Sequence, residues 1–367
     1  MATVVDRWEK EPERYGRGKR YQVRYRDDAK GWRRKAFTRK ADADRYAAQV
    51  QHQLDQGTFR DPNAGHTPFT EYANTWLTNR VDLAPATYNS YRGCLDNHLI
   101  PAFGSVEIAR IRPEHGRSFI AGFEGTKNST ARKATNLASA ILKCGVLDGV
   151  IPSNPFAHIA LPKTPPSAAN PFDPTELDAL LEAMHPWHRC LVLSAAVLGA
   201  RWGELVGLQP QSIDLLHRQV HIKDQLSEAT GRPTRAPLKT PSSHRSITIP
   251  KFLVPHLEEQ LAQRSTPEFV FTTVGGDPIR KSNFNRRYWK PAITKSGLNG
   301  HVFHDLRATA VALAIAGGAH PKAIQERLGH ASINTTFDVY GHMFPSLDAD
   351  IADRLDQSMG TAFGIAN

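Results

Sequence analysis

Hydrophobic and polar residues alternate near the start of the chain. In the stretch YQVRYRDDAKGWRRKAFTR (21–39), the apolar residues Tyr21, Val23 and Tyr25 are separated by polar ones, and a second alternating run follows the turn-forming DAKG. Period-two patterns on both sides of a glycine-containing turn predict a β-hairpin. The next stretch, ADADRYAAQVQHQL (41–54), is typical of a helix with acidic residues near its start. We therefore predict a small sheet followed by a helix.

A helical period replaces this alternation between residues 69 and 160. FTEYANTWL spaces Phe69, Tyr72 and Trp76 along one helix face. APATYNSYRGCLDNHLI predicts a helix that ends at Pro101, and residues 128–150 carry a further long helical pattern. The pattern predicts an all-α domain.

Five prolines in the fourteen residues of LPKTPPSAANPFDP (161–174) indicate a linker. An apolar helix, a β-rich stretch over 219–250 and further helices follow it. The predicted fold is multidomain, mainly α with small β-sheets. We predict a sheet-plus-helix domain over 1–65, a helical domain over 66–160, a linker over 161–172, and an α+β domain over 173–367 that ends in a tail helix.

Composition narrows the class of protein. About 40% of the residues are hydrophobic, which is enough for real cores. No apolar run approaches the 18 or so residues of a membrane span, and no signal-peptide pattern opens the chain, so we expect neither membrane insertion nor secretion. Three widely spaced cysteines, Cys94, Cys144 and Cys190, argue against a disulfide framework and for a reducing cytoplasm.

Positive charge is concentrated at the N-terminus. The chain has a formal net charge of +10, and residues 1–60 hold 16 Lys and Arg against 9 Asp and Glu. A basic block of this kind is expected of a protein that binds the phosphate backbone of nucleic acids, although a solvated surface would also explain it. The candidate DNA contacts on the hairpin are Arg24, Arg26, Arg33 and Arg34.

Several kinds of chemistry have no motif in the chain. The phosphate-binding pattern GxxxxGK[ST] does not occur, so we expect no ATPase of that type. His217 and His221 in HRQVH have metal-like spacing only on a helix, whereas their surroundings are strand-like, and a structural role is the better interpretation. There is no CxxC for a zinc module. We expect neither a cofactor nor a metal.

The remaining candidate chemistry lies in four short stretches. They are LGARWGEL (198–205), LKTPSSHRSITIP (238–250), HDLRATA (304–310) and RLGHASINTTFDVYGHM (327–343). In the first, Arg201 and Glu204 are one helical turn apart. In the third, His304 and Arg307 share a helix face. The second contributes Lys239, and the fourth contributes His330 and Tyr340.

These stretches, in this order, resemble the tyrosine site-specific recombinases, and especially the integrases of phages and mobile elements. That family has an Arg near Gly and Glu, a Lys in a β-hairpin, H-x-x-R, L-G-H and then a Tyr. LGHASINTTFDVYGHM is close to the form found in many integrases of Gram-positive phages and elements. The resemblance extends upstream, where the helical domain looks like their core-binding domain and the N-terminal domain like their arm-binding domain. Each motif is weak alone, but the ordered set is specific.

The resemblance implies a reaction and a role for each residue. The reaction is transesterification of DNA through a covalent 3′-phosphotyrosine. Tyr340 corresponds to the nucleophile, Arg201 and Arg307 to the phosphate clamps, and Lys239 to the general acid. The further roles are proton transfer from the nucleophile by His304, a hydrogen bond from His330 to the phosphate, and orientation of the basic residues by Glu204. Lys223 and Lys251 are alternative acids, and Tyr288 is the rival tyrosine.

The resemblance also implies partners. They are double-stranded DNA with core-type and arm-type attachment sites, a homotetramer on that DNA, and possible DNA-bending and excision factors, all in the bacterial cytoplasm. Residues 347–359 form an apolar stripe on an acidic helix pattern, which in the family often docks on a neighbouring protomer. Two alternatives stay open: a type IB topoisomerase, which uses similar chemistry, and a non-catalytic DNA-binding regulator, which would be expected to lack at least one catalytic residue.

Overall fold

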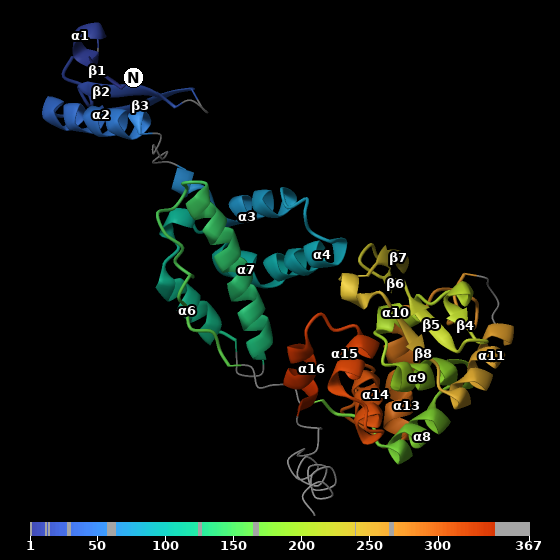
Figure 1. The fold of residues 1–367 in the computed structure, drawn as a ribbon. Helices are drawn as coiled ribbons and strands as arrows, with labels where there is room; N and C mark the ends of the chain where they lie inside the picture. The colour runs from blue at the N-terminus through green and yellow to red at the C-terminus, as the bar shows by residue number, and fades with distance from the viewer. Residues whose placement is uncertain are drawn as a thin grey trace, which may run out of the picture. The chain divides into compact units, whose positions relative to one another are not determined.

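The computed structural model divides the chain into two compact units, Met1–Thr164 and Pro165–Asn367 (Figure 1). It describes residues 2–11, 13, 15–27, 31–56, 64–123, 127–163, 169–238, 240–263 and 268–341. Lys239 and the predicted tail segment 347–359 lie outside these ranges. Helices dominate and the sheets are small, which confirms the predicted fold class. The exact domain boundaries stay a prediction.

The first unit begins with a three-stranded antiparallel sheet of order β1-β2-β3. Its elements are β1 (Thr3–Asp6), α1 (Arg7–Lys10), β2 (Tyr21–Asp27), β3 (Gly31–Phe37) and α2 (Lys40–Asp55). Val23 and Tyr25 of β2 are buried against Ala43, Ala47 and Val50 of α2. The predicted hairpin and helix are confirmed, and β1 is an additional strand that the alternation did not reveal.

The pairing of β2 with β3 separates the four candidate arginines. Arg24 pairs with Arg34, and Arg26 pairs with Trp32, so these side chains share the face that α2 does not cover. Arg33 instead pairs with Tyr25. Directly opposed residues point to the same side of a sheet, and Arg33 therefore lies on the face that carries the small core. The open face holds three of the four arginines.

The rest of the first unit is helical. Its elements are α3 (Phe69–Thr78), α4 (Pro85–Cys94), η3 (Leu95–Leu99), α5 (Ile100–Phe103), η4 (Ile108–Arg110), α6 (Pro113–Ala121) and α7 (Asn128–Leu147). The prediction that the second helix ends at Pro101 is wrong, because the chain stays helical to Phe103. The wide π-turn η3 lies directly before the proline, and such a turn can accommodate a proline ring and its missing N–H.

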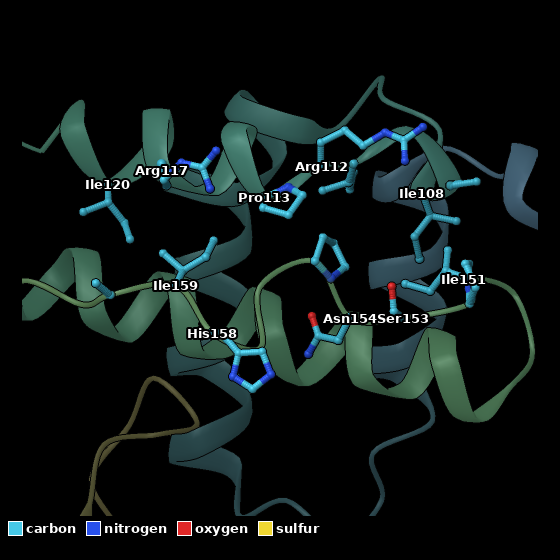
Figure 2. Close-up of a pocket in the computed structure, with 15 residues that line it drawn as sticks. Ile108, Arg112, Pro113, Arg117, Ile120, Ile151, Ser153, Asn154, His158 and Ile159 are labelled. Carbon is cyan, nitrogen blue, oxygen red and sulfur yellow. The ribbon is translucent and has the colours of Figure 1, made fainter.

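A pocket of about 680 Å³ opens between α6, η4 and the segment after α7. Figure 2 shows isoleucines from these segments around it, among them Ile108, Ile151 and Ile159, with the side chains of Arg112 and Arg117 along one side. None of the predicted catalytic residues lines this pocket.

The second unit contains helices around a small sheet and a separate hairpin. Its helices are α8 (Pro174–Ala183), α9 (Pro186–Leu198), α10 (Trp202–Val206), α11 (Val254–Gln263), α12 (Lys281–Phe284), α13 (Lys290–Lys295), α14 (Asp305–Ala316), α15 (Pro321–Leu328) and α16 (Ile333–Tyr340), with the short turns η6 (Pro210–Ser212), η7 (Pro241–Ser243), η8 (Lys251–Leu253) and η9 (Asn285–Trp289). Its strands are β4 (Ile213–Asp214), β5 (Gln219–Ile222), β6 (Asp224–Ser227), β7 (Thr234–Pro237) and β8 (Arg245–Thr248). The sheet has the order β4-β5-β8, and β6 pairs with β7 alone.

Helix α9 lies in the middle of this unit and packs against α14 (Figure 1). Its residues Leu191, Val192, Ala195 and Leu198 are buried, as expected for the apolar helix that the sequence predicted. Within the described residues, every helix is too short or too polar to cross a lipid bilayer.

Candidate active site

The turn between α9 and α10 places Arg201. Gly199 ends α9 with a left-handed φ of +65°, and a Cβ atom there would lie 2.9 Å from Leu328 and 3.0 Å from Ala310. Glycine therefore allows this turn to approach both α14 and α15. Arg201 lies immediately before α10, and its side chain is 37% exposed.

Glu204 joins Arg201 to a second arginine. The carboxylate is 1% exposed and accepts hydrogen bonds from the Arg201 backbone N–H at 2.8 Å, from Arg201 Nη1 at 2.9 Å and from Arg245 Nη2 at 2.8 Å. Burial alone would raise its pKa, but the hydrogen bond and charge of Arg245, reinforced by Arg201, lower the pKa to about 2. Glu204 is thus a carboxylate at neutral pH and holds two cations in place.

Arg245 is a site residue that the sequence analysis missed. Its Nε donates to the carbonyl of Arg327 at 2.7 Å and its Nη1 donates to the carbonyl of Ser243 at 2.9 Å. It thereby connects β8 to α10 and α15. A signal was present, because Arg245 is in phase with the buried Ile247 of the same strand and with Ile249 just after it. An arginine on an inward face needs a buried acceptor, and Glu204 supplies it.

Arg307 lies in the first turn of α14 and is 3% exposed. Its Nη1 donates to the carbonyl of Gly199 at 2.5 Å, and its Nη2 donates to the carbonyl of Leu328 at 2.8 Å. Burial and the positive charge of Arg201 lower its pKa to about 10, which still leaves it protonated at neutral pH. The two carbonyls fix the guanidinium without neutralising its charge.

His304 immediately precedes α14, one turn from Arg307, and is partly exposed. Its pKa is lowered, first by partial burial of the ring and then by the charges of Arg307 and Lys281. A neutral imidazole can accept a proton, so His304 is suited to act as a base.

His330 and Tyr340 come from the turn after α15 and from the last residue of α16. Gly329 ends α15 with a φ of +68°, and His330 Nδ1 then lies 2.9 Å from Thr336 Oγ1. The rings of His330 and Tyr340 are nearly parallel, with centroids 6.4 Å apart. Tyr340 is 4% exposed, and its burial raises the pKa of the phenol, while the charges of Arg307 and Arg201 oppose that rise.

The structure brings together all the predicted catalytic residues that it describes. The charge of Arg307 acts on His304, His330 and Tyr340, and that of Arg201 acts on the same three residues. These side chains converge from segments more than a hundred residues apart in sequence. The result is a compact cluster of cations around a tyrosine hydroxyl.

Lys239 lies outside the described residues, but both of its flanks are held near the site. On one side the hairpin packs on α10, since a Cβ atom on Gly203 would lie 2.7 Å from the carbonyl oxygen of Leu226. The tip of this hairpin contacts α12, where Glu228 accepts a hydrogen bond from the Lys281 N–H at 2.6 Å. On the other side, a Cβ atom on Gly329 would lie 3.0 Å from the carbonyl oxygen of Ser242.

The rival candidates lie elsewhere or have other partners. Tyr288 packs edge-on against His188, with ring centroids 4.3 Å apart, within an aromatic cluster. Lys223 and Lys251 are exposed.

The two histidines with metal-like spacing have other partners. His217 forms a hydrogen bond with Asp214, and His221 forms one with Ser246. Across the ranges that the structure describes, no three His, Cys, Asp or Glu side chains are grouped so that they could hold a metal ion.

Comparison with known proteins matches two parts of this chain to phage integrases. Residues 171–346 match the Phage integrase family, and residues 68–123 match the N-terminal SAM-like domain of phage integrases. The integrase of Mycobacterium phage L5 is 27% identical over 335 residues, which cover 87% of this chain and 89% of the phage protein.

Two solved structures show the same fold. One is the Tn1549 transposon integrase in complex with a circular intermediate DNA, with a TM-score of 0.68 and 17% identity, covering 78% of this chain and 98% of that one. The other is a lambda integrase tetramer bound to a Holliday junction, with a TM-score of 0.59 and 18% identity, covering 84% of this chain and 93% of that one.

The fold and the sequence matches together define a DNA recombinase. The chain belongs to the phage integrase family of tyrosine site-specific recombinases. The comparisons do not favour a topoisomerase or a non-catalytic regulator.

Loss of Arg245 should destabilise the second unit. Arg245→Ala leaves the buried Glu204 carboxylate with one cation fewer, and breaking such a pair costs about 3–5 kcal/mol. Urea unfolding followed by tryptophan fluorescence measures the change. The matched control is Arg235→Ala, which removes an arginine paired with Asp224 on the exposed hairpin and should cost less than about 1 kcal/mol. Equal costs for the two variants would contradict the anchoring role of Arg245.

Acid should weaken the fold partly through Glu204. Its pKa in the folded protein, about 2, is below the ordinary value of 4.5, so its contribution is complete above pH 4.5 and is lost as the pH falls towards 2. That contribution is roughly 3 kcal/mol, from about 1.4 kcal/mol per pKa unit. Glu204→Gln should therefore lose less stability than the wild type when urea midpoints at pH 6 and pH 3 are compared. Parallel losses in the two proteins would show that Glu204 does not titrate in this way.

Proposed function

We propose that this recombinase is an integrase that inserts or excises a phage genome or mobile element through a 3′-phosphotyrosine intermediate. The observation that supports this most strongly is the position of Tyr340 close to Arg307 and Arg201. The positive charges of these two arginines act on its phenol group. A phosphodiester would bring the negative charge that this cluster lacks. The enzyme would act in the bacterial cytoplasm.

Arg201 and Arg307 would bind the two non-bridging oxygens of the scissile phosphate. Negative charge grows on these oxygens as the phosphorus becomes five-coordinate, and fixed cations stabilise it most in the transition state. Arginine suits this role because its planar fork donates two hydrogen bonds and keeps its charge. Glu204 would orient Arg201 without contacting the substrate.

Tyr340 would attack the phosphorus. A bond forms between its Oη and phosphorus, the bond from phosphorus to the 5′-oxygen breaks, and the phenolic proton passes to His304. The ester energy stays in the phosphotyrosine, so the free 5′-hydroxyl of another strand can reverse the step without ATP. Burial raises the pKa of the phenol, so Tyr340 needs a base to accept its proton as it attacks.

The leaving 5′-oxygen requires a proton, and we propose that Lys239 donates it. The hairpin that precedes Lys239 packs on α10 through Gly203, and the turn after Lys239 packs on Gly329, so the described segments on both sides of this lysine lie near the site. His330 would donate a hydrogen bond to the phosphate from its ring.

Double-stranded DNA is the proposed substrate, bound at core-type sites by the helical and catalytic domains. The lambda integrase structure contains a tetramer on a Holliday junction, and we propose the same assembly for this chain. The open face of the N-terminal sheet, with Arg24, Arg26 and Arg34, would bind arm-type sites. DNA is stiff over about 150 base pairs, so we propose a DNA-bending host protein as a further partner. An excision factor is also a proposed partner.

Removing the Tyr340 hydroxyl should abolish cleavage without affecting DNA binding. Tyr340→Phe deletes one oxygen, so DNA affinity should stay within about twofold, while cleavage of a nicked core-site substrate should fall below detection. Arg201→Ala, which loses a clamp, should cleave about 10² to 10³ times more slowly than the wild type. Tyr288→Phe is the matched control, and its cleavage rate should equal that of the wild type. Residual wild-type cleavage by Tyr340→Phe would refute the proposed nucleophile.

Deletion of residues 1–60 should separate the two kinds of DNA binding. This segment carries most of the net positive charge, so its loss should abolish gel-shift binding to arm-type sites and leave cleavage at the core site intact. The triple variant Arg24→Ala, Arg26→Ala, Arg34→Ala should weaken arm binding while Arg33→Ala weakens it less. Full arm-site affinity in the deletion variant would show that the arm domain has been assigned wrongly.

A further inference from the structure

His330 and Thr336 form a pair beside the nucleophile. Nδ1 of His330 lies 2.9 Å from Oγ1 of Thr336, and the Thr336 side chain is fully buried in α16. Tyr340 follows Thr336 by four residues, so both side chains lie on the same face of that helix. The residue that holds the His330 ring therefore lies one helical turn before Tyr340.

The hydroxyl hydrogen of Thr336 needs an acceptor. A buried hydroxyl that cannot donate pays the cost of its lost hydration, so nearly all such groups are paired. Among the described residues, the partner that the structure gives to this side chain is His330 Nδ1. If Nδ1 carried a hydrogen, it would donate to Oγ1 and leave the hydroxyl hydrogen without an acceptor in that part of the chain. The hydrogen bond therefore runs from Thr336 to Nδ1.

The surroundings of His330 keep its ring neutral. Burial lowers the pKa of the imidazole to about 4, and the positive charges of Arg307, Arg201 and Arg245 and the nearby His304 act in the same direction. A neutral imidazole has one N–H and one bare nitrogen. Since Nδ1 accepts from Thr336, the hydrogen must be on Nε2.

We propose that Thr336 is a positioning residue that fixes the hydrogen of neutral His330 on Nε2, so that Nε2 donates to a non-bridging oxygen of the scissile phosphate. This inference rests on the proposed function, which places the phosphate beside His330. The opposite tautomer would present a lone pair to a negatively charged oxygen and would repel it. Fixing the tautomer before DNA binds removes a rearrangement from the reaction.

Nitrogen-15 NMR of the full-length wild-type protein, labelled at histidine, tests the tautomer directly. The protonated and bare ring nitrogens resonate far apart, and His330→Ala identifies the signals of His330. At pH 7 we expect Nε2 to be protonated and Nδ1 to be bare. A hydrogen on Nδ1, or a doubly protonated ring, would overturn the proposal. This measurement needs no Thr336 variant and stands even if such a variant fails to fold.

Three variants test the consequence for the reaction. Thr336→Val keeps the shape of the side chain but removes the hydroxyl, and should slow cleavage on the order of tenfold, the scale seen when an outer hydrogen-bond partner of a functional histidine is lost. Thr336→Ser keeps the hydroxyl and should stay within about twofold of the wild type. Thr335→Val is the matched control, because it makes the same change at an exposed position of the same helix. A wild-type rate for Thr336→Val, or equal losses for the valine and serine variants, would contradict the inference.

The proposed role of His330 itself can fail separately. If His330→Ala cleaves at the wild-type rate, His330 does not contact the phosphate, and that part of the proposed function is wrong whatever the tautomer. If His330→Ala is slow while the wild-type ring carries its hydrogen on Nδ1, the proposed function stands and the role of Thr336 is wrong.

Discussion

The rest of the site depends on the ion pairs that the buried Glu204 carboxylate makes with Arg201 and Arg245. Arg201, Arg245 and Arg307 converge within one small region, and like charges at such distances repel one another in a partly desolvated setting. Glu204 offsets this repulsion for two of them, and its strongly lowered pKa reflects the strength of that contact. Arg307 donates to two carbonyl oxygens, and its own pKa is lowered by burial and by Arg201. The three arginines thus carry two positive charges more than the Glu204 carboxylate balances, and a bound phosphate would offset part of this excess.

Glycines set the geometry in which this network can form. Gly199 and Gly329 end α9 and α15 in left-handed conformations, and both lie where an added Cβ would come within about 3 Å of a neighbouring segment. Gly203 lets the hairpin lie directly on α10. The contacts at Gly203 and Gly329 are with backbone atoms, whereas Gly199 approaches the side chains of Leu328 and Ala310. Leu226 and Ser242, which take part in two of these contacts, lie before and after Lys239 in the sequence.

The sequence predicted most of the fold and the candidate site, for physical reasons that differ by element. Period-two and helical patterns located the N-terminal hairpin and α9, because burial of one face imposes them. The motif residues could be named because their chemistry restricts the residue types. The phase of Arg245 with Ile247 indicates an inward-facing position, but its partner Glu204 is 41 residues away and no local pattern identifies it. Arg33 was grouped with the other arginines because which face β3 turns to α2 depends on its register with β2. The helix through Pro101 escaped because a π-turn has no simple sequence signature.

The account makes Tyr340 a nucleophile, although in the free protein its hydroxyl is buried and its pKa is raised. The measurement that tests this most directly is to identify the residue that becomes covalently attached to DNA. A core-site substrate nicked just beyond the cleavage point would release the short strand with its 5′-hydroxyl and trap the intermediate. After proteolysis, mass spectrometry should find the nucleotide on Tyr340, from reactions run with chelator and without ATP. Attachment to Tyr288 or any other residue, or a requirement for a metal ion, would contradict the account.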